Sequence, residues 1–475
     1  MAKLNLIRTA CIFVFCAGTV IALPAQTFNT LVSFDGTNGS APLNASLVQG
    51  TDGNYYGTTT SGGANDDGAV FKMTPRGTLT TLHSFAGYPT DGAAPYAGLV
   101  QSTGGNFYGT TQLGGTYDVG TVFEMAPSGK LTTLFSFDNT DGRSPNGALV
   151  QANGSFYGTT FYGGAHGYGT VFKISPAGVL TTLHSFDVTD GESPWAGLTQ
   201  ADNGNFYGTT SLGGGNGYGT FFEMTPSGTL TTLYSFCIQG GGCADGEFPY
   251  STPIQGADGN FYGTAPVGGD LTCNAPDGCG TVFQITPTGR LTVLHSFEVN
   301  DGAFPFTGLV QGTDRNLYGV TSDGGSNGLN GNGGTVFQIS TAGTLTTLYD
   351  FCTQDCTDGD HPESALIQGT NGTFYGVTPD AGANNDGTVF SVSMGLGPFV
   401  ETRPNSGKAG AKVTILGNNL TGTTSVTFNG TAATFTVVKS SEITATVPTG
   451  ATTGAVEVTT PKKTLKSNVA FRVTP

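Results

Sequence analysis

Few residues in this chain combine the chemistry and the spacing of a catalytic centre. Of five histidines, three occupy one repeated position, TLHSF, where other repeats carry Phe or Tyr; we interpret these three as structural: His83, His184 and His295. His166 and His361 stand alone in loop sequence. No G-x-S-x-G, H-E-x-x-H or phosphate-loop motif is present. The sequence therefore predicts no catalytic residues, no bound metal and no enzyme activity.

Six cysteines could carry redox or metal chemistry, and they fall into three close pairs: Cys237/Cys243, Cys273/Cys279 and Cys352/Cys356. An even number in an exported chain favours disulfides. Zinc is the alternative, but the spacings C-x5-C and C-x3-C differ from the common C-x2-C pattern. Pairing within each short loop is the simplest of 15 arrangements.

Residues 1–25 predict export. Lys3 and Arg8 precede an apolar run that ends at a small-residue cleavage point before Gln26. The run is short for a membrane anchor, which is the alternative, and no other stretch competes with it. We therefore expect an extracellular or cell-surface protein with no transmembrane segment after cleavage.

Charge is distributed unevenly along the chain. Residues 26–397 hold 7 Lys/Arg and 30 Asp/Glu, whereas residues 398–475 hold 8 and 3. An acidic body argues against nucleic acid as a partner and is compatible with cations or neutral glycans. Three lysines near the C-terminus are interpreted as solvated surface: Lys462, Lys463 and Lys466.

The elements that must position any site are repeated. With 77 glycines and only 11% charged residues, the chain is predicted to be all-β. A segment of the LTTLHSF type ends at seven similarly spaced phenylalanines: Phe34, Phe85, Phe137, Phe186, Phe236, Phe297 and Phe351. Each unit of about 50 residues holds four short β-type runs, which is typical of a propeller blade.

The ends of the array predict closure. It opens with one lone strand at 28–34 and finishes with three, at 363–369, 373–378 and 387–393. One plus three completes a seventh blade, so we expect a seven-bladed β-propeller over residues 26–394 whose N-terminal strand closes the last blade. A β-solenoid is the alternative, but it would not need this offset. A linker at 395–397 follows.

Three residue types recur in every unit. A Tyr-Gly pair lies in the second strand, a Phe in the third, and a Gln ends the first. Because catalysis breaks symmetry and a core keeps it, we interpret the Tyr and Phe as packing between blades and the Gln as a hydrogen-bonding spacer.

The DG-x2-P, NFYGTT and GTVF-x2-TP-x-G-x-LTTL segments resemble the Gloeo/Verruco (GloVer) repeat of exported bacterial proteins, over residues 28–393. That resemblance implies location more than chemistry. Residues 398–475, with PNSG, KVTI, TFNG and TVP segments, are similar to IPT/TIG domains and imply an immunoglobulin-like β-sandwich. In bacterial surface proteins such domains space, dock or bind glycans.

Long loops and all six paired cysteines map to one propeller face, which should bear the binding site. A recurring Asp-Gly-x-x-Pro turn there is interpreted as an Asx-type turn, with a Ca²⁺-attracting carboxylate ring as the alternative. At the channel mouth, the residues opening the inner strands vary. Beside Asn44, the candidate ligand-binding residues are Tyr96, Asn146, Trp195, Tyr250, Phe306 and Glu363.

These features predict a non-enzymatic scaffold or binding protein whose partner is a carbohydrate or another surface protein. The aromatic residues at the mouth would stack on sugar rings, although they could instead only plug the channel. A polysaccharide hydrolase or lyase is the alternative function; three or more converging Asp, Glu or His side chains on the inner strands would favour it.

Overall fold

The computed structural model describes residues 26–238, 242–329 and 333–474. The predicted signal peptide, residues 1–25, lies outside the described residues. Within them the protein is all-β, with a single short 3₁₀ turn, η1 (Gly325–Asn327). No described helix is long and apolar enough to cross a membrane.

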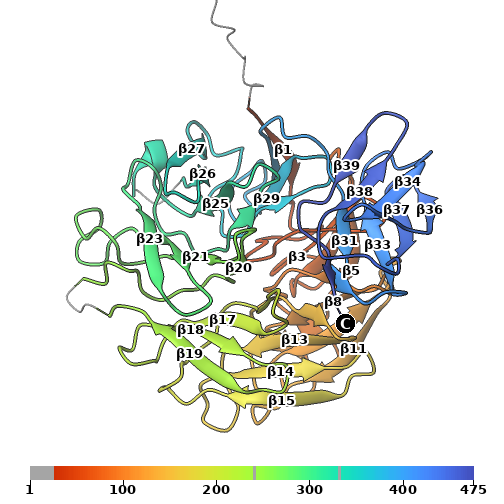
Figure 1. Ribbon diagram of the computed structural model, residues 1–475. Coiled ribbons are helices and arrows are strands. Elements are labelled where there is room, and N and C mark those ends of the chain that lie inside the picture. The colour runs from red at the N-terminus through yellow and green to blue at the C-terminus, as the bar shows by residue number, and fades with distance from the viewer. Residues whose placement is uncertain (1–25, 239–241, 330–332, 475) are drawn as a thin grey trace, which may run out of the picture.

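Seven four-stranded antiparallel sheets account for the repeats, in a propeller-like arrangement (Figure 1). Sheet one contains β2 (Val48–Gln49), β3 (Tyr55–Thr59), β4 (Ala69–Met73) and β5 (Leu79–Ser84). Sheet two contains β7 (Val100–Gln101), β8 (Phe107–Thr111), β10 (Thr121–Met125) and β11 (Leu131–Ser136). Sheet three contains β12 (Val150–Ala152), β13 (Ser155–Thr160), β14 (Thr170–Ile174) and β15 (Leu180–Ser185).

Sheets four to six repeat this order. Sheet four contains β16 (Thr199–Gln200), β17 (Phe206–Thr210), β18 (Thr220–Met224) and β19 (Leu230–Ser235). Sheet five contains β20 (Ile254–Gln255), β21 (Phe261–Ala265), β22 (Thr281–Ile285) and β23 (Leu291–Ser296). Sheet six contains β24 (Val310–Gln311), β25 (Leu317–Thr321), β26 (Thr335–Ile339) and β27 (Leu345–Asp350).

Sheet seven joins the two ends of the array. Its order is β28 (Ile367–Gln368), β29 (Phe374–Thr378), β30 (Thr388–Ser393) and then β1 (Thr27–Ser33). β1 runs antiparallel to β30, with Thr27 opposite Ser393, as the strand count predicted. A small ladder, β6 (Gly92–Ala93) with β9 (Leu113–Gly114), lies beside sheet two.

Aromatic packing joins neighbouring sheets. In each second strand the recurring Tyr and the residue before it, which is Phe in five sheets, Tyr in sheet one and Leu in sheet six, point to opposite sides, because strand side chains alternate. Tyr56 of sheet one therefore meets Phe107 of sheet two, with ring centroids 4.1 Å apart, and Tyr375 of sheet seven meets Tyr55 of sheet one at 4.2 Å. A Cβ at Gly57 would lie 2.6 Å from the Phe71 ring, which explains the glycine after each tyrosine.

The recurring glutamines also join sheets. Gln101 Oε1 accepts a hydrogen bond from the Thr51 N–H of the preceding sheet at 2.9 Å. The same bond links Thr370 of sheet seven to Gln49 of sheet one, also at 2.9 Å. The structure thus bears out the sequence-based interpretation of the glutamines as hydrogen-bonding spacers.

The C-terminal module, residues 398–474, consists of two four-stranded sheets around an apolar core. One contains β31 (Glu401–Arg403), β33 (Lys412–Leu416), β37 (Glu442–Thr446) and β36 (Phe435–Lys439). The other contains β35 (Thr431–Ala432), β34 (Ser425–Phe428), β38 (Val456–Thr459) and β39 (Thr464–Lys466). A short parallel pair joins β32 (Ser406–Gly407) to β40 (Arg472–Val473).

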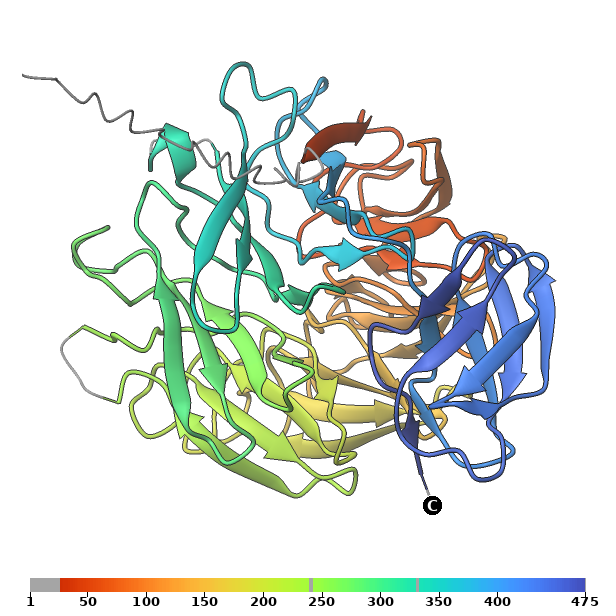
Figure 2. The same ribbon diagram turned by 45° about the horizontal axis from the view of Figure 1, so that its top comes forward.

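The module lies against the propeller face that carries the tight hairpin turns, which we call the plain face (Figure 2). Ser441 Oγ donates to the Thr51 carbonyl at 2.8 Å, and Asn418 Nδ2 donates to Thr370 Oγ1 at 2.7 Å. Arg472 donates to the Asp202 carbonyl. The module therefore contacts hairpin turns of sheets seven, one and four and leaves the opposite, loop-bearing face uncovered.

Candidate functional site

On the loop-bearing face, where the sequence predicts a channel mouth, the residues that open the inner strands include a row of aromatic rings. Trp195 meets Tyr96 and Tyr250 with centroids 5.6 and 5.4 Å apart, and Tyr250 lies 6.1 Å from Phe306. Phe161 joins the row 5.0 Å from Trp195 and was not identified from the sequence. All five side chains of this aromatic row are partly exposed.

The polar residues of the mouth have different surroundings. Asn146 is only 4% exposed, and its Oδ1 accepts a hydrogen bond from Gln112 Nε2 at 3.1 Å. Glu363 is largely buried, and that burial raises its pKa to about 7. The pKa of Tyr96 is raised by burial and by the Glu363 charge, while a hydrogen bond with Asn44 opposes the rise. Asn44, Tyr96 and Glu363 thus form one polar group.

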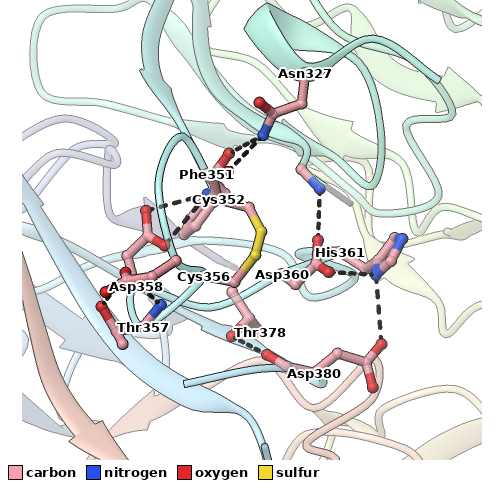
Figure 3. Close-up of a disulfide and its surroundings, with 12 residues drawn as sticks. Asn327, Phe351, Cys352, Cys356, Thr357, Asp358, Asp360, His361, Thr378 and Asp380 are labelled. Carbon is pink, nitrogen blue, oxygen red and sulfur yellow. Dashed lines mark hydrogen bonds and ion pairs between the residues drawn. A yellow bond between two sulfur atoms is a disulfide. The ribbon is translucent and has the colours of Figure 1, made fainter. Parts of the chain in front are cut away.

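A histidine lies among carboxylates next to Glu363. His361 Nδ1 lies 3.4 Å from an Asp360 oxygen and 3.5 Å from an Asp380 oxygen (Figure 3). His361 Nε2 lies 3.8 Å from an Asp323 oxygen. Bonding to Asp380 and the surrounding negative charge raise the pKa of His361 to about 9, although burial opposes this. We call His361, Asp323, Asp360, Asp380 and Glu363 together the acid–histidine cluster.

Sequence reasoning treated His361 as an isolated loop residue, and the structure shows otherwise. Asp323 and Asp380 follow the second strands of sheets six and seven, where they pair with the turns that open the same repeats through the bridges Ala303–Asp323 and Asp360–Asp380. The equivalent bridging residues elsewhere are Ser, Leu, Tyr or Val. The presence of Asp at this position in only two repeats was the sequence signal that could have identified Asp323 and Asp380.

The aspartates of the Asp-Gly-x-x-Pro turns form hydrogen bonds within the fold. Asp91, Asp190 and Asp301 accept from the repeated histidines at 2.7–2.9 Å, and Asp245 and Asp358 accept from Tyr234 and Tyr349. We call each such pair an outer latch. The structure supports the interpretation of the three histidines as structural. Each of these carboxylates bonds to a side chain of the outer strand that precedes its turn.

The residue before the proline of this turn has a positive φ in all seven repeats, from 49° to 56°. Its N–H bonds to a carbonyl of the preceding sheet, as in His361 to Gly333 and Ala41 to Asp386, both at 3.1 Å. A left-handed backbone is strained for non-glycine residues, so this turn is held by its neighbours. The turn therefore fixes the backbone position of the residue that opens each inner strand.

Three disulfides brace the loops as predicted: Cys237–Cys243, Cys273–Cys279 and Cys352–Cys356. The third lies beside the acid–histidine cluster (Figure 3). Among the described residues, one group has ligand atoms close enough to hold a metal, namely Cys352, Cys356 and Asp360. Its two sulfurs are bonded to each other, so it offers no thiolate ligand.

Exposed large apolar side chains gather on one part of the loop-bearing face. Eight of them lie in the loops of sheets two to four and the connections next to them: Tyr88, Leu113, Tyr117, Tyr162, Tyr168, Val188, Tyr218 and Ile238. Tyr162 packs on Phe161 at 4.3 Å and so extends the aromatic row outward. In the described parts of sheets six, seven and one, no large apolar side chain is comparably exposed.

A family model matches this sequence three times in tandem, at residues 14–204, 189–390 and 274–468, and its description is the Gloeobacter/Verrucomicrobia repeat. The chain belongs to the Gloeobacter/Verrucomicrobia repeat family. A search of curated proteins finds no match to this sequence.

Solved structures resemble this Gloeobacter/Verrucomicrobia repeat protein in fold. A fungal alcohol oxidase of the AA5 family, in complex with copper, shares 14% identity at a TM-score of 0.53, covering 94% of this chain and 99% of that one. The extracellular domain assigned to a hybrid two component system of B. thetaiotaomicron shares 10% identity at a TM-score of 0.50 and covers 83% of this chain. This chain spans 46% of that protein.

Proposed function

We propose that this is an exported surface protein that binds a carbohydrate on its loop-bearing face. In this proposal the seven sheets are the blades of a closed seven-bladed β-propeller, and the C-terminal module is an immunoglobulin-like domain of the IPT/TIG type. The β1–β30 pairing and the Thr370–Gln49 hydrogen bond support closure. The paired disulfides fit an oxidising compartment outside the cytoplasm.

The observation that carries the proposal is the exposed aromatic surface that continues from the mouth. Trp195 is partly exposed and belongs to a row of rings that Tyr162 extends onto the loops. Soluble proteins rarely gather exposed apolar side chains without a binding role. A sugar offers an apolar ring face for stacking and hydroxyl edges for the polar group at Asn44, Tyr96 and Glu363.

A glycan array probed with residues 26–475 tests the proposal. We expect weak binding, with a Kd of about 10 μM to 1 mM. Trp195→Ala should weaken it roughly tenfold because it removes the central stacking ring, which contacts three others.

Val179→Ala is the matched control, because Val179 is exposed outside the loop-bearing face. It should leave binding unchanged, and circular dichroism should show both variants folded. Binding that is unaffected by Trp195→Ala would mean that the row only plugs the channel.

A second candidate function is a polysaccharide hydrolase or lyase, and the acid–histidine cluster favours it. A carboxyl group with a pKa near 7 beside aromatic rings suits a general acid. Release of reducing or unsaturated ends from any polysaccharide bound on the array, abolished by Glu363→Gln, would establish catalysis. Binding without turnover would leave the protein a lectin-like binder.

A further inference from the structure

A cavity of about 1170 Å³ lies between the plain face of the propeller-like array and the C-terminal module, where the inner strands end, whereas the aromatic row lies where they begin. Val100 and Val150, near the ends of inner strands, form part of its apolar wall. The module supplies the opposite wall from one face of its β31–β33–β37 sheet, including Thr414 and Thr444. The cavity is therefore apolar on one side and hydroxyl-bearing on the other.

The charges of this cavity are unbalanced toward positive. Two carboxylates line it, and each already has a cationic partner. Glu401 binds Arg403 through Nε at 2.7 Å and Nη2 at 3.2 Å, and Glu442 binds Lys439 at 3.0 Å. Lys412 also lines the cavity. Within the described residues, no carboxylate oxygen lies within 4.0 Å of its ammonium nitrogen.

Arg403 has a further unused donor. Its Nη1 is buried and, among the described residues, has no hydrogen-bond partner. A guanidinium donor without an acceptor costs free energy, so the Arg403 side chain would gain by turning this nitrogen toward an oxygen in the cavity. Because guanidinium groups bind carboxylates through charge-assisted hydrogen bonds, a ligand carboxylate fits this position.

We propose that this cavity binds an acidic oligosaccharide, with a uronate carboxylate at Arg403 and Lys412. Sugar ring faces would lie on the valine wall, and their hydroxyls would meet the threonines of the module. The volume slightly exceeds the usual range for ligand pockets, about 300–1,000 Å³, and so suits two or three sugar units. The site is independent of the aromatic row, whose neighbouring carboxylates disfavour anions.

Isothermal titration of residues 26–475 with trigalacturonate tests this site, with maltotriose as a neutral probe of similar size. We expect trigalacturonate to bind at least tenfold more tightly than maltotriose. Arg403→Gln and Lys412→Gln should each weaken trigalacturonate binding about tenfold. Lys412 is exposed, so its variant remains informative if Arg403→Gln, which leaves Glu401 without its partner, fails to fold.

The matched control removes more positive charge from the same module but outside the cavity. Lys462, Lys463 and Lys466 are exposed and do not line it. Replacing all three by Ala should leave the affinity unchanged. The proposal is overturned if trigalacturonate does not bind, if the triple variant weakens binding as much as Lys412→Gln, or if Trp195→Ala abolishes it and so places the ligand at the aromatic row.

Discussion

At the scale of single residues, the mouth shows how one repeated position takes on different roles. The residue after the Asp-Gly-x-x-Pro turn is Trp195 in the fourth repeat, where it joins three other rings. In the third repeat it is the buried Asn146, and in the seventh it is Glu363, whose pKa is raised by burial. The backbone is the same in each case, so the chemistry of the mouth depends on side chains alone.

The raised pKa of Glu363 predicts a pH-dependent stability. The folded protein holds this proton up to about pH 7, whereas the unfolded chain loses it near pH 4.5. Stability should therefore fall as pH rises through this window. Glu363→Gln removes the effect, so the variant should gain up to about 3 kcal/mol over the wild type between pH 4 and pH 8, measured by urea denaturation.

His361→Gln is the comparison variant, and its effect changes in a higher pH window than that of Glu363→Gln. The pKa of His361 is raised to about 9, so its ion pairs stabilise the folded state fully below pH 6.5 and lose their effect as pH rises through 9. The variant should thus be weakest relative to the wild type below pH 6.5 and should approach it as pH rises through 9. A stability difference between His361→Gln and the wild type that does not shrink between pH 6.5 and pH 9 would contradict the raised pKa of His361.

How far the site was predictable depended on symmetry. Tyr96, Trp195, Tyr250 and Phe306 could be placed because they vary at a position that the repeat itself marks. Asp323 and Asp380 were missed because they act on His361 from loops of different repeats, and no spacing rule links them. Phe161 was missed because it follows a strand in a loop whose path the sequence does not specify.

At the scale of elements, the outer latch ties each outer strand to the turn that follows it. Five repeats have a His or Tyr that donates to, or pairs with, the turn Asp. The second repeat has Phe135 there, and Asp141 instead accepts from backbone N–H groups, including that of Asp138. The pKa of Asp141 is raised, chiefly by burial.

Restoring the latch should stabilise the second sheet. Phe135→Tyr adds a hydroxyl at the point where Tyr234 and Tyr349 reach their carboxylates at 2.7 and 2.8 Å. We expect a gain of about 1 kcal/mol in the free energy of unfolding. Tyr234→Phe, the reverse change in the fourth sheet, should cost about 1–2 kcal/mol. A destabilised Phe135→Tyr variant would show that the latch geometry is not shared.

At the scale of the whole molecule, β1 holds the two ends of the array together. Phe28 stacks on Tyr349 with centroids 3.7 Å apart and packs on Phe390 at 5.5 Å, so β1 contributes to the core as well as to the sheet. Without it, β30 would present an unpaired edge, which favours aggregation.

Removing residues 27–34 should therefore cause aggregation or a lower midpoint of thermal unfolding, seen by size exclusion and calorimetry. A synthetic TFNTLVSF peptide supplied in excess should raise that midpoint again. A variant without residues 398–475 serves as the comparison. Because the module contacts the plain face through only a few hairpin turns, its removal should change the midpoint of thermal unfolding less than removal of residues 27–34 does. A truncation at 27–34 that unfolds like the full chain would mean that β1 does not hold the array closed.

The sheets could be predicted at this scale because each repeat reports the same pattern. The docking position of the C-terminal module could not be predicted from the sequence. Its contacts use single residues, namely Ser441, Asn418 and Arg472, against carbonyl and hydroxyl groups. Backbone acceptors carry no sequence signature. The cavity under the module was invisible for the same reason.

The pairing of β1 with β30 also sets an order of events in time. Thr27 is made among the first residues and its partner Ser393 hundreds of residues later, so sheet seven cannot form until nearly the whole array has been synthesised. Such a distant contact slows folding, because a long loop must close before the pairing gains free energy. The first strand to emerge is thus the last to be placed. Refolding should end in a slow unimolecular phase during which the edge of β30 is open, and chaperones that shield strand edges would act in that interval.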